Sequence, residues 1–369
     1  MKSISRISIL ILILIVAFGN QSCKKEKIDP PTSNSVPKTF TVDIPSSLSR
    51  NEVVNKDMKT DPLNGNIIYY HLCSYIYAAE KSAEFVQQIM IAISAYNINH
   101  PMSFSYMNNE DIRLKNVVVV ENSEFQGTTW KFQLTITDAL SESNPDGGKA
   151  FQVFWNTSPI KGIAVLKAYN ADRVNWIDFP ETMYSVQYSE TGAGGYTNQM
   201  IVSLADIPLT NPLDNPYSVS TMKMFAGKDG NCVDVLGNSN HPNAKFFTTQ
   251  TGFNWAFVAS CNYPLNIAVA EVGLPESTLN TSDRTVILKD NSIKNIFTDQ
   301  IYETWPSLDS ASVATYLFNT DPPGYFDQNG FIKGGTAPNA NYAIIETRMN
   351  LLSPYNPFQV TNLTIEFKP

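Results

Sequence analysis

The first 23 residues constrain the chain more than any other stretch. Two basic residues, Lys2 and Arg6, precede a predominantly apolar run over residues 7–18, and small or polar residues follow it up to Cys23. A helix that spans a bilayer needs about 20 apolar residues, so this run is too short to be a membrane anchor. A basic start, a short apolar segment and small residues at its end are typical of a secretory signal. We therefore expect the body of the protein to fold outside the cytoplasm.

Cys23 directly follows the small residue Ser22, at the end of this signal. The junction resembles the lipobox of bacterial lipoprotein precursors. The resemblance implies removal of residues 1–22, diacylglycerol on the Cys23 sulfur and an acyl chain on its new amine. Two acyl signals hold a protein on a membrane where one chain would release it. The resemblance covers only the targeting segment, and it implies an outer-membrane lipoprotein that faces either the periplasm or the cell surface.

The remainder divides into a tether and one or two folded parts. Residues 23–45 are polar and carry several prolines, a composition that cannot bury a core, so we expect a flexible tether. A single hydrophobic core stops growing near about 250 to 300 residues. We therefore expect a helix plus an antiparallel β half over residues 46–207 and a second β-rich half over residues 208–369, with one elaborated domain as the alternative. The proposed boundary is marked by Pro208, Pro212 and Pro216.

Hydrophobic periodicity predicts one helical stretch followed by many strands. Between residues 66 and 97, apolar residues recur at three- and four-residue steps, which predicts one long amphipathic helix or two shorter ones. From residue 113 onward, apolar and polar residues alternate, most clearly over residues 130–137. We expect an α+β fold, predominantly antiparallel β, built as a sandwich or a curved, barrel-like sheet with one long N-terminal helical stretch.

Turn signals divide the later part of the chain into short segments. The glycine-rich residues 191–195 predict a hairpin tip, and Asn329-Gly330 predicts a tight turn. A short amphipathic helix is predicted over residues 293–305, ended by Pro306. The predicted strands are residues 130–136, 150–156, 163–169, 184–188, 196–204, 253–259, 266–272, 284–288, 342–349 and 360–367.

The cysteines and acidic residues give no metal signature. Outside the cytoplasm Cys232 and Cys261 could form a disulfide, and two separate buried thiols are an equal alternative. The chain has no CxxC and no zinc-finger spacing of cysteine and histidine. Oxygen donors over residues 229–234 and 327–330 do not complete an EF-hand and are more typical of turns. We therefore predict neither a metal nor another cofactor.

Complete catalytic motifs are also missing. The three histidines, His71, His100 and His241, lie in no HExxH, and the chain has no GxSxG, P-loop or dinucleotide glycine pattern. Ser239 stands beside His241, but the asparagine-rich segment around them is more typical of a turn. Two SxxK matches, at residues 158–161 and 220–223, lack the helix and partner motifs that they would need. Aromatic residues that could contact a ligand, but more often form core, are Tyr69, Tyr70, Tyr75 and Tyr77 on the predicted helix and Trp155, Trp176, Trp255 and Trp305 beyond it.

Composition narrows the functional classes. The net charge of −8 gives no electrostatic footprint for nucleic acid. We expect a lipid-anchored cell-envelope protein with a non-catalytic binding or structural role, attached to the membrane through its N-terminal lipid and able to bind a glycan, peptide or lipid. One alternative is a periplasmic carrier of a lipid or other apolar ligand in a cavity between a curved sheet and the long helix. Another is a carbohydrate-active enzyme whose dispersed carboxylates leave no local signature.

Overall fold

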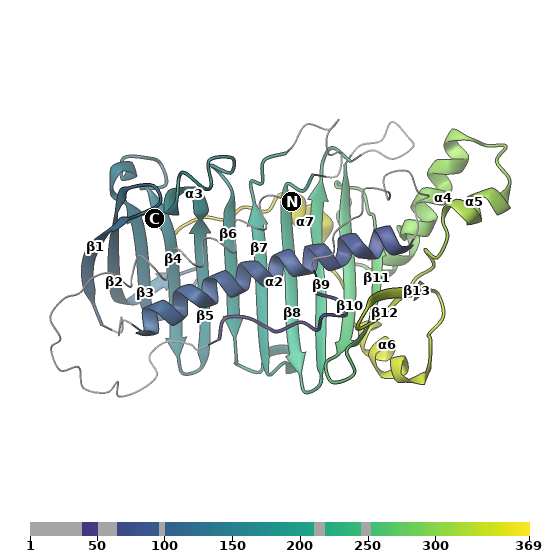
Figure 1. The fold of residues 1–369 in the computed structure, drawn as a ribbon, viewed down its shortest axis with the longest axis horizontal. Coiled ribbons are helices and arrows are strands. Elements are labelled where there is room, and N and C mark those ends of the chain that lie inside the picture. Colours follow the sequence, from purple (N-terminus) through teal and green to yellow (C-terminus); the bar gives the residue numbers. More distant parts are fainter. Residues whose placement is uncertain (1–38, 51–64, 96–99, 210–217, 245–251) are drawn as a thin grey trace. The chain divides into compact units, whose positions relative to one another are not determined.

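The computed structural model describes residues 39–50, 65–95, 100–209, 218–244 and 252–369 (Figure 1). The chain forms two compact units. Of the described residues, 39–41, 81–95, 100–208 and 364–369 belong to unit 1, and 42–50, 65–80, 209, 218–244 and 252–363 belong to unit 2. The chain passes from unit 1 to unit 2 between Pro208 and Leu209. Residues 42–50 and 65–80 precede the strands of unit 1 in the chain but belong to unit 2, and residues 364–369 follow unit 2 in the chain but belong to unit 1.

Antiparallel strands form the body of both units, and the predicted α+β, mostly antiparallel fold class is confirmed. Within each unit, strands that are consecutive in the chain are hydrogen-bonded neighbours. Unit 1 contains β1 Met102–Asn108, β2 Arg113–Phe125, β3 Thr128–Asp138, β4 Lys149–Thr157, β5 Ile160–Lys167, β6 Met183–Ser189 and β7 Asn198–Ala205. Unit 2 contains β8 Thr221–Asp229, β9 Cys232–His241, β10 Phe253–Asn262, β11 Ile267–Gly273, β12 Gly324–Asp327 and β13 Gly330–Gly334.

One helix, α2 (Gly65–Ala95), supplies the long helical stretch that the periodicity predicts. Its first half belongs to unit 2 and its second half to unit 1. In each unit the helix runs across one face of the strands, which we call the inner face, and the opposite face is the outer face (Figure 1). Residues three or four positions apart lie on one side of a helix, so this side is buried along the whole length of α2. The fully or almost fully buried residues include Ile68, Leu72, Ile76, Val86, Met90 and Ile93.

A short extended segment, residues 39–41, packs with the helix on the inner face of unit 1. The backbone N–H of Phe40 donates to Oε1 of Gln87 on α2 at 3.0 Å. The ring of Phe40 stacks on Tyr188 of β6, with centroids 5.7 Å apart. A side chain on Gly162 would begin 2.5 Å from the Phe40 ring, so glycine is needed at this point of β5.

Unit 2 is covered on both faces of its strands. The first half of α2 covers the inner face, and the helical segments η4 (Thr285–Asp290, a π-helix), α6 (Ala343–Met349) and α7 (Pro357–Thr361) cover the outer face. Ile345 and Met349 of α6 form a buried cluster with Val258 and Val269. Because both faces are sealed, β10 and β11 are buried almost continuously, as expected for strands packed on two sides.

The remaining helices are short. Ser292 caps α4 (Ile293–Thr304) by accepting a hydrogen bond from the backbone N–H of Asn295, and the predicted helix over residues 293–305 is confirmed. No helix in the described ranges is long and apolar enough to cross a membrane. The other short elements are α3 Ala168–Ala171, α5 Ser310–Tyr316, η2 Ala139–Ser141, η3 Ala193–Gly195 and η5 Ala340–Tyr342.

Three predicted strands are wrong. Residues 284–288 lie mostly in the π-helix η4, residues 342–349 form α6 together with the end of η5, and residues 360–367 contain the end of α7 followed by irregular backbone. These segments are rich in Val and Ile, which favours strands when packing is ignored. Each is short and packs on the outer face of unit 2 or continues along unit 1, so tertiary packing overrides the local preference.

Candidate ligand pocket

Six side chains form two rows on the outer face of unit 1, across β5, β6 and β7. In the strand register, residues of β5 lie opposite residues of β6, which in turn lie opposite residues of β7. Gly162 and Tyr188 face Phe40 on the inner face, so their neighbours in the chain face outward, because side chains alternate along a strand. The outward rows are Lys161–Ser189–Gln199 and Ile163–Gln187–Ile201.

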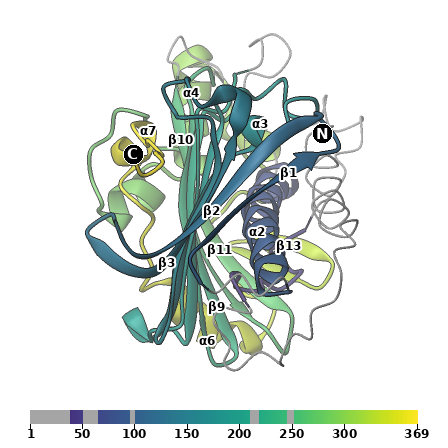
Figure 2. The ribbon, with the colours of Figure 1, turned by 90° about the vertical axis from the view of Figure 1, so that its left-hand side faces the viewer.

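The tip of the β2–β3 hairpin folds over the outer face of unit 1. The two turn residues, Gln126 and Gly127, have φ of 49° and 70°, the left-handed values that a tight two-residue hairpin turn needs. Figure 2 shows this tip on the side of the unit 1 strands opposite α2. The ring of Phe125 stacks on Phe154 of β4 at 4.3 Å between centroids. Apolar packing with Phe154 therefore holds the tip against the outer face.

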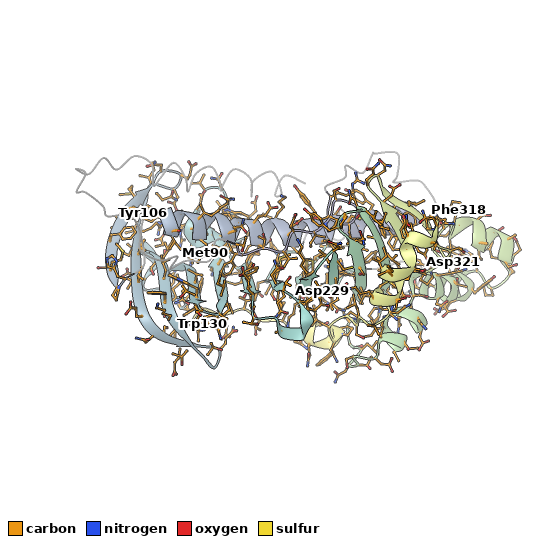
Figure 3. All side chains as sticks on the ribbon, turned by 90° about the horizontal axis from the view of Figure 1, so that it is seen from below. Met90, Tyr106, Trp130, Asp229, Phe318 and Asp321 are labelled. Atoms are coloured by element: carbon orange, nitrogen blue, oxygen red, sulfur yellow. The ribbon has the colours of Figure 1, made fainter. Side chains whose placement is uncertain are left out.

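Trp130 reaches the outer face because the hairpin changes direction near its tip. Phe132, two residues further along β3, stacks on Trp155 with centroids 5.2 Å apart. By simple alternation Trp130 would lie on the same face as Phe132, yet its ring packs beside Phe154, which precedes Trp155 and faces the other way. On the paired strand, Asn122 has φ of 55°, which interrupts the extended backbone at this level. Figure 3 shows Trp130 on the side of the unit 1 strands away from Met90 of α2.

A pocket of about 250 Å³ lies between the hairpin tip and the two outward rows. The tip contributes Gln126, Thr128 and Trp130, and the two rows contribute their six side chains. The intervening strand residues Gly162, Tyr188 and Met200 complete the lining. We call this space the glutamine pocket, after the three glutamines Gln126, Gln187 and Gln199 that line it. Primary amides both donate and accept hydrogen bonds, so the lining can bind a ligand rich in hydroxyl groups.

Lys161 is the one charged residue among those that line the glutamine pocket. Its Nζ lies 5.2 Å from the centroid of the Trp130 ring, within the range of a cation–π interaction. Within the part of the chain that the structure describes, no carboxylate lies at ion-pair distance from this ammonium group. Lys161 therefore brings a positive charge to the wall of an otherwise uncharged pocket.

The C-terminal residues cover the outer face of unit 1 next to the glutamine pocket. The backbone N–H of Lys368 donates to Oε1 of the buried Gln152 on β4 at 2.8 Å. The Lys368 ammonium donates to Oγ of Ser123 on β2 at 2.6 Å. These contacts lie on β2 and β4, whereas the rows of the pocket lie on β5, β6 and β7. The tail thus covers a different part of the same face.

A buried ion cluster stabilises the end of unit 1 at which β2 begins and β3 ends. The carboxylate of Asp138, which is fully buried, accepts two hydrogen bonds from Arg113, at 2.6 and 2.7 Å, and one from Lys115 at 2.9 Å. Burial alone would raise the pKa of Asp138, but the hydrogen bonds from the two cations hold it well below its ordinary value. Both cations are bound to the same carboxylate, which is typical of a structural cluster rather than a site that awaits a ligand.

Ser239 and His241 form a hydrogen-bonded pair in unit 2. The segment predicted as an asparagine-rich turn is instead part of strand β9, so that prediction is wrong. The serine Oγ and the histidine Nε2 lie 2.8 Å apart, a distance that suits a nucleophile and its base. The exposed fractions of the two residues are 0% and 5%, and the His241 ring packs beside Tyr75 of α2. In this conformation a substrate cannot reach the serine oxygen, so the pair is part of the core.

Of the two alternatives for Cys232 and Cys261, a disulfide and two separate thiols, the structure has the separate thiols. Cys261 lies opposite Val233 in the β9–β10 register, and Cys232 is the residue before Val233. Neighbouring side chains on a strand point to opposite faces, so the two thiols lie on opposite sides of the strands. Burial raises the pKa of the Cys261 thiol well above its ordinary value, which makes it unreactive. Cys23, the predicted site of lipid attachment, lies outside the described residues.

The acidic turn segments bind protein groups. Asp229 and Asp234 both accept hydrogen bonds from Arg348 of α6, each at 2.8 Å. Asp327 accepts from the backbone N–H of Asn329 at 2.7 Å, which is ordinary turn geometry. Among the described residues, no group of three or more histidine, cysteine or acidic side chains is arranged to hold a metal ion.

The other residues considered from the sequence lie apart from the glutamine pocket, with one exception. Neither SxxK segment is helical, and Lys161 of the first segment is the lysine of the pocket. Trp155 and Trp176 are buried, whereas Trp305 is about half exposed on the surface of unit 2. His71 contacts Trp255 within unit 2, and His100 is exposed before β1. On α2, Tyr69 is core, and Tyr70, Tyr75 and Tyr77 are partly exposed.

Comparison of the chain with protein-family models, with curated protein sequences and with solved structures finds no match. Function is therefore inferred from the residues of the pocket and from the N-terminal sequence.

Proposed function

We propose that the protein is a lipid-anchored component of the cell envelope that binds a glycan, without transforming it, in the glutamine pocket. The observation that carries this proposal is a pocket of about 250 Å³ lined by three glutamine amides, two hydroxyl groups, a lysine and a tryptophan. Pockets for drug-sized ligands occupy about 300 to 1,000 Å³, so the pocket suits a unit of one or two sugar rings.

The position of the pocket favours a glycan over a peptide. Peptides that bind sheets usually add a strand to an exposed edge. The glutamine pocket lies on the face of β5, β6 and β7. There β5 is paired with β4 and β6, and β6 is paired with β5 and β7, so their backbone groups are already hydrogen-bonded within the strands. Recognition there must come from side chains, and amides with an aromatic wall match the alternating hydroxyls and C–H groups of a sugar.

The lining also supports binding rather than hydrolysis. Glycoside hydrolysis requires two carboxyl groups on either side of the scissile bond. No residue that lines the glutamine pocket is acidic. A function as a lipid carrier has less support from unit 1. The apolar pocket that Phe85, Val86 and Trp176 line there has a volume of only about 20 Å³, about enough for one water molecule.

Titration of the purified full chain with a panel of envelope glycans tests the proposed ligand class. We expect one or more glycans to bind, and Gln187→Ala to weaken that binding at least about fivefold, because each lost polar contact costs about 1 to 3 kcal/mol. Gln187 is exposed, so its truncation should leave the fold intact. Gln328→Ala, at an exposed turn of unit 2, is the matched control and should bind as the wild type does. Failure of every glycan to bind would refute the proposal, as would binding that Gln187→Ala leaves unchanged.

Replacement of the N-terminal cysteine tests the anchor separately. We expect Cys23→Ala to abolish fatty-acid labelling and to release the protein from the membrane fraction, because the lipid would be its attachment. Cys232→Ala, which removes a partly exposed thiol of unit 2, should remain membrane-bound and labelled. If Cys23→Ala is labelled and sediments with membranes as the wild type does, the protein is not anchored in this way.

A further inference from the structure

The charge in the glutamine pocket points to a narrower class of ligand. Eleven of the twelve residues that line the pocket are uncharged, and the twelfth is Lys161. The chain as a whole has a net charge of −8, so its average field repels anions. A lone ammonium group inside a polar pocket of an acidic protein is the local feature that could select an anionic ligand.

The ammonium group is held in place before any ligand arrives. Lys161 Nζ lies 5.2 Å from the Trp130 ring centroid. Trp130 is itself fixed, because its Nε1 donates to the backbone carbonyl of Phe125 at 3.2 Å and its ring packs on Phe154. A cation over an aromatic face still has N–H groups that can donate to a ligand. Less side-chain entropy is then lost when an anion binds.

The neighbours of Lys161 suit a sugar ring that carries the anion. Lys161, Ser189 and Gln199 form one row across the three strands, and Gln187 lies in the adjacent row. Hydroxyl groups of a ring can exchange hydrogen bonds with the serine and the two amides while its acidic group lies at the end of the row. A free inorganic anion would leave the amides without partners, so it fits the pocket less well.

We propose that the ligand of the glutamine pocket is an acidic sugar, with its carboxylate or sulfate bound by Lys161 and its hydroxyls by the glutamine amides. This inference rests on the proposed function, because it names the chemistry of the ligand of the same pocket. Lys161 is then the residue that determines specificity, and Trp130 positions it.

The test compares matched glycans on the purified full chain at low and at physiological salt. The probes are a neutral hexose oligomer, the uronic acid oligomer of the same linkage, and its sulfated neutral counterpart. We expect at least about tenfold tighter binding of one or both acidic oligomers, with a preference that shrinks as salt is added, because salt screens an exposed charge pair. Lys161→Gln should remove the preference, so that the acidic oligomers bind no more tightly than the neutral oligomer, whereas Lys161→Arg should retain the preference.

A nearby lysine outside the pocket provides the matched control. Lys131 lies on the same hairpin, is exposed and has its Nζ 5.1 Å from the Phe132 ring centroid. Lys131→Gln makes the same charge change and should keep the preference. Equal binding of neutral and acidic oligomers, or a preference that survives Lys161→Gln, overturns the inference while the pocket remains a glycan site. Absence of binding by every oligomer overturns the proposed function together with the inference.

Discussion

The two units use α2 in the same way on their inner faces but differ on their outer faces. In unit 2 the outer face is sealed by η4, α6 and α7, with Ile345 fully buried in an apolar cluster against the strands. In unit 1 the outer face carries rows of polar side chains, and the cover consists of a hairpin tip and the C-terminal tail. A sealed face gives stability, whereas a partly covered polar face leaves room for a ligand. The difference places the candidate site in unit 1.

The sequences of the strands explain this difference. In unit 2, β11 is buried at all but one of its seven positions, so it needs cover on both faces. In unit 1, the outward residues Gln187, Ser189 and Gln199 of β6 and β7 alternate with the buried inward residues Val186, Tyr188 and Met200, so the inner face of each strand is apolar and the outer face is more polar. Such strands need a single apolar cover, which α2 provides on the inner face.

Loss of a buried charge in unit 1 should have the largest effect, because it leaves buried cations without a carboxylate. Asp138→Asn would leave Arg113 and Lys115 without their shared carboxylate, and removal of one partner of a buried ion pair costs about 3 to 5 kcal/mol. Denaturant titration near neutral pH measures the free energy of unfolding. Glu121→Gln, at an exposed position of β2, should change it by less than about 0.5 kcal/mol. Equal stability of the two variants would show that the cluster does not stabilise unit 1.

Truncation of matched isoleucines compares the two outer faces directly. Ile345 on α6 is fully buried, whereas Ile201 on β7 is partly exposed at the glutamine pocket. We expect Ile345→Ala to lower the free energy of unfolding by about 2 to 5 kcal/mol, because it leaves a cavity in a packed core. Ile201→Ala should cost less than about 1.5 kcal/mol, because less apolar area returns to water. Similar losses for the two variants would contradict the distinction between a sealed and an open face.

Periodicity predicted the elements that are long or regular. Helix α2 is visible in the sequence because the same side is buried over all 31 of its residues. The alternating strands β3 and β6 were predicted because one face of each strand is more exposed to solvent and the other is buried. Strands β8 and β9 were missed, because Gly227 and Gly237 interrupt the pattern and Asn238 and Asn240 favour turns in isolation. In the fold, Asn240 is buried and donates to Asn254 on the neighbouring strand at 3.3 Å.

The glutamine pocket could be predicted only in part. Alternation along β6 and β7 already implies that Gln187 and Ser189 share one face. Nothing local shows that the β2–β3 tip folds over that face, because the fold-over depends on the φ of Asn122 and on ring packing between residues 29 positions apart, Phe125 and Phe154. From the sequence, Trp155 was a candidate for ligand contact and Trp130 was not. In the structure Trp155 stacks on Phe132 in the core, and Trp130 lines the pocket.

The smallest expected effect is a dependence of stability on pH. The two units should lose stability in different pH ranges. Burial lowers the pKa of His71, on the unit 2 half of α2, below its ordinary value of 6.5. Above that pH the imidazole is neutral in both the folded and the unfolded chain. As the pH falls below it, the unfolded chain binds a proton that the folded chain does not, so the free energy of unfolding decreases until the lowered pKa is passed. The decrease is at most about 1.4 kcal/mol per pH unit for one proton.

Asp138 in unit 1 behaves differently, because its pKa is lowered from 3.8 and its contribution is complete near neutral pH. That contribution is lost only as the pH falls from about 4 through the folded value. Between pH 6.5 and 5, acid should therefore weaken unit 2 and leave unit 1 unchanged. Hydrogen exchange of the two units over this pH range measures the difference. In His71→Gln, the protection of unit 2 should depend less on pH than in the wild type, with the protection of the same variant at pH 8 as the reference. If unit 2 of His71→Gln loses protection between pH 6.5 and 5 as steeply as the wild type, the acid response does not come from His71.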